Sequence, residues 1–304
     1  MIVGLGVGQG RNPSGGGARM AAASVSPDAV LVEQPETAVH RLGEHVFDMV
    51  AEIGDVGLFS VQTLTWIVRR RPRWSVMVPI FYAIGVQSVS VVAITGTFIG
   101  MVLAVQAHHQ FQMMGLATRL GSVINISLVK ELGPVLAATM LAGRVGSSMA
   151  AELGTMRVTE QIDALSALGT NPIYYLVVPW FLACLTLIPL LTLMADFMGV
   201  IGGAVITTQV MGVDSFAYWK HSRDFVEGLD IFAGIFKSYF FGAAIALISC
   251  HRGFHSSAGA EGVGKAATEA FVFSFMAILF LDFVLGIGWN MVYRSIWPQA
   301  SGLL

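Results

Sequence analysis

Residues 130–179 decide the fold, because they hold two apolar segments joined by a short polar one: KELGPVLAATMLAGRVGSSMAAELGTMRVTEQIDALSALGTNPIYYLVVP. The first segment is rich in small residues, which let membrane helices approach each other closely. These residues form two lines at helical spacing, Gly143, Ser147 and Ala151 on one and Gly146, Ala150 and Gly154 on the next. We therefore predict that this segment is a membrane helix packed tightly against its neighbours.

The polar segment predicts a short amphipathic helix over Glu160–Leu168. Thr159 is its predicted N-cap, and Gly169 followed by Asn171-Pro172 supplies a stop. Apolar residues recur at three- and four-residue spacing and face the polar ones. The apolar side has Val158, Ile162, Leu165 and Leu168, and the polar side has Glu160, Gln161 and Asp163. At roughly nine residues the helix is too short to span a membrane. It lies outside the bilayer, either as an interfacial connector or as a docking element.

Composition places the whole chain among membrane proteins. Apolar residues make up 55% of it and charged residues 12%, and the mean hydropathy is +0.72. A net charge of -2 gives no indication of nucleic-acid binding. Cys184 and Cys250 fall in apolar segments and are expected to be small buried side chains.

Apolar segments predict five membrane spans and an amphipathic entry helix. Residues 1–38 are rich in Gly, Ala, Ser and Pro and are predicted to be disordered. Residues 39–74 hold the amphipathic helix, about Glu44 to Val68, which ends in the basic anchor Arg69, Arg70, Arg71 and Arg73. Residues 75–304 hold the spans, within 75–107, 121–154, 172–206, 229–250 and 268–292. The excess of arginine and lysine on one side of these spans favours a cytoplasmic N-terminus, which places the helix Glu160–Leu168 on the cytoplasmic side.

Two stretches carry a resemblance to known permeases. One stretch resembles the EAA---G coupling-helix pattern of permeases that dock on ATP-hydrolysing subunits. It consists of Asp163-Ala164-Leu165, followed after three further residues by Gly169. The stretch AELGTMRVTEQIDALSALGTNPIYYLVVP, residues 151–179, is similar to the MlaE/YrbE family, the permease subunits of MCE-associated ABC lipid transporters. This similarity runs from about Arg73 to Trp289. It implies a coupling helix that includes Glu160, Gln161, Ile162, Asp163, Ala164, Leu165 and Gly169.

Three charged residues stand out inside the predicted spans: Glu131, Lys237 and Asp282. Charges are costly in lipid and usually face a cavity or one another. All three lie some 10–16 Å below the outer surface at 1.5 Å per helical residue, so we expect them to meet. They form either a structural ion-pair network or a site that holds a lipid headgroup. The family resemblance implies the second role, because MlaE-like permeases carry charges at these positions along the lipid cavity.

Other motifs predict no cofactor, metal or nucleotide site. The segment Gly259–Ala266, GAEGVGKA, fits GxxxxGK but has Ala266 where a phosphate-binding loop needs Ser or Thr, so we expect a glycine-rich loop leading into the last span. His251 and His255 have the spacing of helical metal ligands, but the sequence offers no third ligand. They are therefore predicted to be solvated interfacial histidines.

The sequence thus predicts an all-α inner-membrane permease subunit without catalytic machinery of its own. It would move phospholipid or a related lipid between the inner membrane and the periplasm or outer membrane. By resemblance its partners are a cytoplasmic ABC ATPase and an MCE-domain substrate-binding protein. Five spans are few for a pathway, which favours a homodimer with a shared cavity. The alternative is an ion-coupled secondary transporter that uses the intramembrane charges.

Overall fold

The structure is a computed structural model that describes residues 38–69, 74–115 and 119–296. Every regular element in these ranges is helical, which confirms the predicted all-α fold class, and short π-helical turns (η) interrupt the long helices. The elements are α1 (Ala38–Arg69), α2 (Trp74–Phe81), η1 (Tyr82–Val86), α3 (Gln87–Met113), α4 (Leu120–Ser127), η3 (Leu128–Leu132), α5 (Gly133–Leu141), η4 (Ala142–Gly146), α6 (Ser147–Val158), α7 (Gln161–Ala167), η5 (Ile173–Val177), α8 (Val178–Val205), η6 (Ile206–Val210), α9 (Ser215–Phe225), α10 (Gly228–Phe254) and α11 (Gly259–Ile296).

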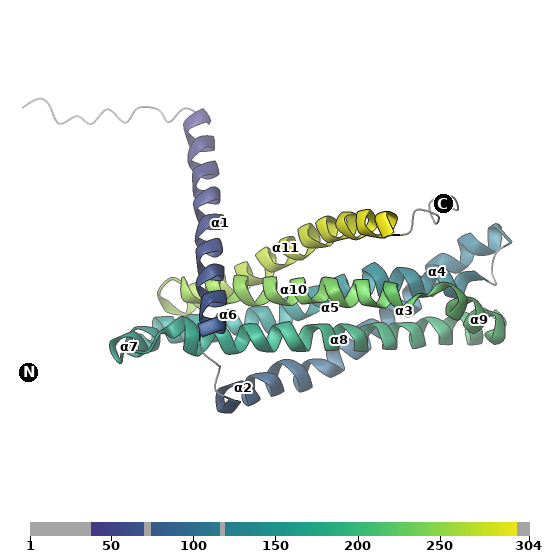
Figure 1. Cartoon of the computed structure of the whole chain (residues 1–304), viewed down its shortest axis with the longest axis horizontal. Helices are drawn as coiled ribbons and strands as arrows, with labels where there is room; N and C mark the ends of the chain where they lie inside the picture. The colour runs from purple at the N-terminus through teal and green to yellow at the C-terminus, as the bar shows by residue number, and fades with distance from the viewer. Residues whose placement is uncertain (1–37, 70–73, 116–118, 297–304) are drawn as a thin grey trace, which may run out of the picture. The chain divides into compact units, whose positions relative to one another are not determined.

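Five helical stretches are long and apolar enough to cross a membrane, as predicted. They are Trp74–Met113, Leu120–Val158, Ile173–Val210, Gly228–Phe254 and Gly259–Tyr293. Each exceeds the roughly 20 residues that a membrane span requires. The short helix α7 separates the second span from the third, and α9 separates the third from the fourth. Figure 1 shows α7 and α9 at opposite ends of the helical bundle.

The chain divides into two compact units, Met1–Val50 and Ala51–Leu304. The described part of the first unit is the N-terminal part of α1. The second unit contains all five spans. Residues 1–37 of the segment predicted to be disordered lie outside the described residues, as do Arg70, Arg71 and Arg73 of the basic anchor.

Helix α3 lies along α8 with glycine at the points of closest approach (Figure 1). A Cβ atom added at Gly96 would lie 2.6 Å from the carbonyl oxygen of Ala195, and one added at Gly100 would lie 1.8 Å from that of Gly199. The two backbones are therefore in direct contact, which a larger residue would prevent. This crossing fixes the first span against the third.

The core of the Ala51–Leu304 unit is centred on α8, which packs against α3, α5 and α10. Helix α6 packs in turn against α10 and α11. The largest fully buried apolar side chains of this core include Leu141, Met149, Ile188, Phe241, Ile245 and Ile278. The small-residue segment identified in the sequence thus lies among the buried helices of the bundle.

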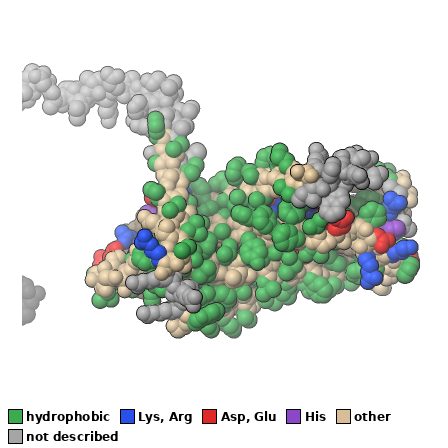
Figure 2. All heavy atoms as spheres, viewed as in Figure 1, with side chains coloured by type: hydrophobic (Ala, Val, Ile, Leu, Met, Phe, Trp, Pro, Cys, Tyr) green, Lys and Arg blue, Asp and Glu red, His purple; other side chains and the backbone are tan. Residues whose placement is uncertain are grey.

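Hydrophobic side chains also cover the outside of the bundle between its two ends (Figure 2). Exposed ones recur at helical spacing on α3, at Ile94, Phe98, Val102 and Val105, and on α11, at Phe280, Phe283, Ile287 and Met291. Charged side chains gather instead near the ends that carry α7 and α9 (Figure 2). An apolar surface bounded by charged ends is what a membrane requires. The chain is therefore a multi-pass membrane protein.

From Ala51 onward α1 has a buried side and an apolar exposed side. Phe59 and Thr63 are buried, and the Phe59 ring meets the His251 ring edge-on with 5.5 Å between centroids. Leu58 and Val61, on the other side, are exposed. A helix is thus present where the amphipathic entry helix was predicted, and from Ala51 onward its buried side contacts the end of α10.

The glycine-rich segment Gly259–Ala266, predicted as a loop, is helical instead, because α11 begins at Gly259. Gly262 packs onto the turn before the helix, where an added Cβ would lie 2.1 Å from the Ser257 carbonyl oxygen. Glycine here therefore serves close packing at the start of a helix, which the composition alone does not distinguish from a loop.

Candidate functional site

The polar segment between the second and third spans forms α7, a helix of seven residues flanked by capping residues. The predicted N-cap was wrong. Thr159 ends α6, where its hydroxyl donates to the Thr155 carbonyl at 2.8 Å, and Glu160 takes the N-cap position with a left-handed φ of 58°. The chain therefore turns at Glu160, and α7 packs against the end of α6.

The C-terminal end of α7 follows the predicted stop signal. Gly169 has a φ of +74°, a conformation that glycine adopts without strain. The amide of Gly169 donates to the Ser166 carbonyl at 3.0 Å, and that of Thr170 donates to the Leu165 carbonyl at 3.1 Å. These two bonds form a Schellman motif. Asn171 then caps the next helix, since its Oδ1 accepts from the amide of Ile173 at 3.0 Å.

One side of α7 is anchored and the other is open. Ile162 is buried, whereas Asp163 and Ala164 are exposed and Leu168 is 79% exposed. The predicted apolar face is therefore only partly covered, because the bundle does not reach as far as Leu168. Arg157 at the end of α6 donates to Asp163 at 2.6 Å and holds α7 from its N-terminal side. This end of the bundle thus presents a surface of acidic and apolar side chains.

Two of the three intramembrane charges meet as predicted. The ammonium of Lys237 on α10 donates to Oδ1 of Asp282 on α11 at 2.8 Å. The Lys237 side chain is 5% exposed and the Asp282 side chain 27%. The ammonium also lies near Gly286, one turn after Asp282, at 3.8 Å from where a Cβ would be. The pair therefore joins the fourth and fifth spans through a largely desolvated contact.

The third charge, Glu131, does not join this pair. It lies exposed in η3, and no described side chain forms an ion pair with it. Its neighbour Lys130 instead lies 3.5 Å from Asp230 in the first turn of α10. The expectation that all three charges meet was wrong for Glu131, because depth along the helices constrains their level in the bundle but not the direction in which each points.

A further charge inside the spans, Asp196, was not among the predicted site residues. It lies in α8 and is 7% exposed, and its Oδ1 has no partner among the described residues. The glycine at position 133 makes space for it, since an added Cβ there would lie 1.7 Å from Oδ1. The signal was available, as Asp196 is an acidic residue in the apolar segment 172–206.

The predicted small-residue lines contact two different helices. Gly146 faces α10, where an added Cβ would lie 2.8 Å from the Ser249 hydroxyl. On the same line the Ala150 backbone lies against Gly253, and Gly154 accepts a hydrogen bond from Ser256 at 3.3 Å. The other line is looser, because Gly143 would place its Cβ 3.5 Å from the Phe271 ring of α11. Ser147 on that line is partly buried.

A cavity of about 810 Å³ opens at the opposite end of the bundle, beside α9. Helix α9 was not predicted, and it is held by Tyr218, whose hydroxyl donates to Asn125 at 3.3 Å, and by Ser222, which accepts from Asn125 at 2.8 Å. Both polar and apolar side chains line the cavity, among them Asn125, Trp219, Lys220, Arg223 and Asp224. This lining suits a molecule with a charged head and an apolar body.

Comparison with known proteins identifies the relatives of the chain. The family described as Permease MlaE matches residues 77–287. A probable ABC transporter permease protein of Rickettsia bellii is 39% identical over 246 residues, which cover 81% of this chain and 95% of the relative. The intermembrane phospholipid transport system permease protein MlaE of Haemophilus influenzae is 32% identical over 248 residues, covering 81% and 95%. The chloroplastic protein TRIGALACTOSYLDIACYLGLYCEROL 1 of Arabidopsis thaliana is 36% identical over 230 residues, covering 76% and 66%.

Proposed function

Because the chain belongs to the MlaE permease family, we propose that it is the permease subunit of an ABC transporter for phospholipid or a related lipid. Transport runs between the inner membrane and the periplasm or outer membrane, and a separate cytoplasmic ATPase drives it. The observation that carries the proposal is α7, a short helix outside the spans with an open acidic and apolar surface. The chain itself performs no catalysis.

Helix α7 is the proposed contact with the ATPase. It is joined directly to α6 on one side and, through a Schellman turn, to the third span on the other. A force on α7 is therefore transmitted to two membrane helices at once. The exposed Asp163 and Leu168 supply a charged and an apolar contact, which together give a partner both orientation and affinity.

A lipid pathway is supported by the distribution of charge and apolar surface. Lys237 of α10 pairs with Asp282 of α11, and it can exchange this bond for one to an anionic headgroup. The cavity beside α9 adds Lys220 and Arg223 at the outer end of the bundle. We propose that these cations contact the phosphate while the acyl chains follow the apolar surface of the helices.

A homodimer would complete the pathway. A groove between α3 and the second span is lined by Phe98, Val102, Leu132 and Leu136. Glu131, the residue before Leu132, is exposed. A second copy of the chain placed here covers the apolar residues and places Glu131 in a shared central cavity. An MCE-domain protein on the outer side is the further proposed partner.

The test is charge reversal on α7. We expect Glu160→Lys/Asp163→Lys to lower ATPase association when the two proteins are co-expressed and purified from membranes, and Leu168→Asp to do the same without removing an ion pair. Glu261→Lys, at an exposed position in the first turn of α11, is the matched control and should leave association unchanged. Wild-type association of both α7 variants would contradict the docking role of α7.

The second candidate function is ion-coupled secondary transport, and the buried Lys237–Asp282 pair is the observation that favours it. In such a transporter a carboxylate changes its protonation state as the substrate moves. Transport by the purified chain alone, driven by a proton gradient and insensitive to ATP, would favour this function. Transport that requires the ATPase and ATP favours the ABC permease.

A further inference from the structure

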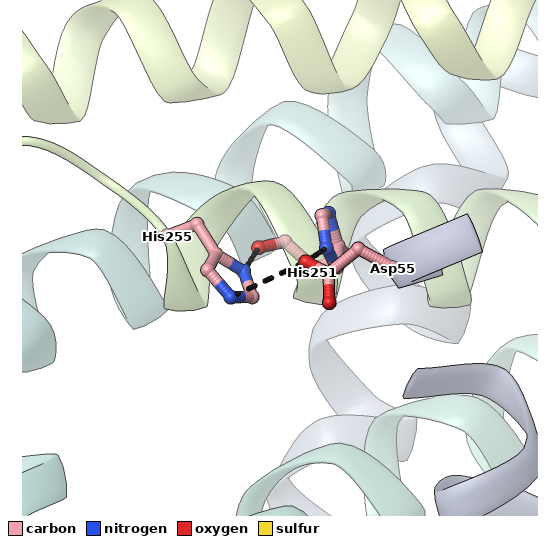
Figure 3. Close-up of side chains that lie close together, drawn as sticks. All are labelled: Asp55, His251 and His255. Carbon is pink, nitrogen blue, oxygen red and sulfur yellow. Dashed lines mark hydrogen bonds and ion pairs between the residues drawn. The ribbon is translucent and has the colours of Figure 1, made fainter. Parts of the chain in front are cut away.

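Three potential metal ligands converge where α1 meets the end of α10. Figure 3 shows Asp55 of α1 beside His251 and His255, which lie one turn apart at the end of α10. Oδ2 of Asp55 lies 2.9 Å from Nε2 of His251 and 3.7 Å from Nε2 of His255. All three ligand atoms lie within 4.8 Å of one another. The sequence analysis found no third ligand because Asp55 is 196 residues away from His251 along the chain.

The hydrogen bonds of the two histidines direct both Nε2 atoms to this point. Nδ1 of His255 lies 2.9 Å from the His251 carbonyl oxygen, which can only accept, so the neutral ring carries its proton on Nδ1 and a lone pair on Nε2. This is the outer-shell bond that orients metal-binding histidines. The ring of His251 contacts polar groups only through Nε2, because its buried Nδ1 has no partner among the described residues.

We propose that Asp55, His251 and His255 bind one divalent transition-metal ion of the zinc type. Two ligands bound about 2.1 Å from a tetrahedral ion lie about 3.4 Å apart, and the observed separations of 2.9 and 3.7 Å lie on either side of that value. Two imidazole nitrogens and one carboxylate favour zinc over calcium or magnesium, which prefer oxygen ligands. The fourth position is left for water.

The surroundings accommodate a cation. The neighbouring positive side chain of Arg252 is neutralised by Glu52 at 2.5 Å and by Glu269 at 3.4 Å. Asp55 and His255 are both more than half exposed, so an ion can reach the site from the aqueous side. The Phe59 ring against His251 keeps that ligand in place. A bound ion would link α1 to the turn between the fourth and fifth spans.

The test is Co²⁺ titration of the full-length chain in detergent, purified with an affinity tag that contains no histidines. We expect one equivalent of Co²⁺ to bind with the visible absorption of a tetrahedral site, and Zn²⁺ to displace it. His255→Ala and Asp55→Ala should each weaken binding at least about 10-fold. These two side chains are exposed, so their removal leaves the core intact. His109→Ala, on an exposed residue of α3, is the control and should bind as wild type does.

Thermal unfolding supplies a readout that does not depend on cobalt. ZnCl₂ should raise the unfolding temperature of the wild type and of His109→Ala but not of His255→Ala, since only a folded site binds the ion. Three results would overturn the proposal: no saturable binding of one equivalent, equal binding by His255→Ala and the wild type, or a cobalt–thiolate absorption band. The last would place the ion at Cys184 or Cys250, both of which are buried.

Discussion

The Lys237–Asp282 pair allows a structural role to be separated from a role in transport. At 2.8 Å and an effective dielectric constant of about 20, the attraction between the two charges is about 6 kcal/mol before desolvation is subtracted. Removing one partner leaves the other charge buried. We therefore expect Asp282→Asn to lower the free energy of unfolding by about 3–5 kcal/mol, because the Lys237 side chain is only 5% exposed.

Replacing both partners with apolar side chains has a different expected outcome. A buried ion pair can usually be exchanged for hydrophobic residues at little cost, so Lys237→Met/Asp282→Val should unfold within about 1 kcal/mol of the wild type or be more stable. Transport should nevertheless be lost, because the ammonium that contacts the lipid phosphate is gone. Lys265→Met removes a lysine that is 72% exposed and serves as the control, with a stability change below about 1 kcal/mol.

The two quantities require separate assays. Denaturant unfolding of the detergent-solubilised chain gives stability, and ATP-dependent transfer of a fluorescent phospholipid from proteoliposomes gives transport. Wild-type transport by the double variant would refute the lipid-contact role and leave the pair a purely structural one. Unchanged stability of Asp282→Asn would instead show that the ion pair does not form.

Two further predictions concern backbone geometry. Gly100→Ala should lower the free energy of unfolding by about 1–3 kcal/mol, since its Cβ would collide with the Gly199 carbonyl. The control is Gly288→Ala on α11, whose Cβ would meet nothing within 4 Å and which should have no destabilising effect. Equal losses of stability in denaturant unfolding would contradict the α3–α8 contact. Gly169→Ala should destabilise the end of α7 by roughly 1–2 kcal/mol because its φ is +74°, and Gly169→Asn should destabilise it less. Co-purification of the ATPase should be highest for the wild type, lower for Gly169→Asn and lowest for Gly169→Ala. Identical yields for all three chains would argue against a fixed α7.

Features set by local sequence were predictable. The five spans follow from the length of their apolar segments, and the end of α7 follows from Gly169 and Asn171, whose effects extend over only a few residues. The start of α7 was not predictable, because Glu160 adopts a left-handed conformation that its residue type does not favour.

Features that depend on which helices meet were largely not predictable. Depth in the membrane brought Lys237 and Asp282 to one level and correctly suggested a pair, but it gave no information on the direction in which Glu131 points. The α3–α8 crossing carried a signal that the sequence analysis passed over, since Gly96 and Gly100 form a GxxxG pattern. The cluster of Asp55, His251 and His255 carried no such signal, because no local sequence pattern relates α1 to the end of α10.

We propose that an ATPase acting on this membrane subunit moves lipid. The most direct measurement is to co-express the chain with its genomic neighbours, purify the assembly, and assay ATP hydrolysis while identifying co-eluting lipids by mass spectrometry. We expect vanadate-sensitive hydrolysis by an assembly that retains phospholipid. A chain that elutes alone, without ATPase or lipid, would contradict it.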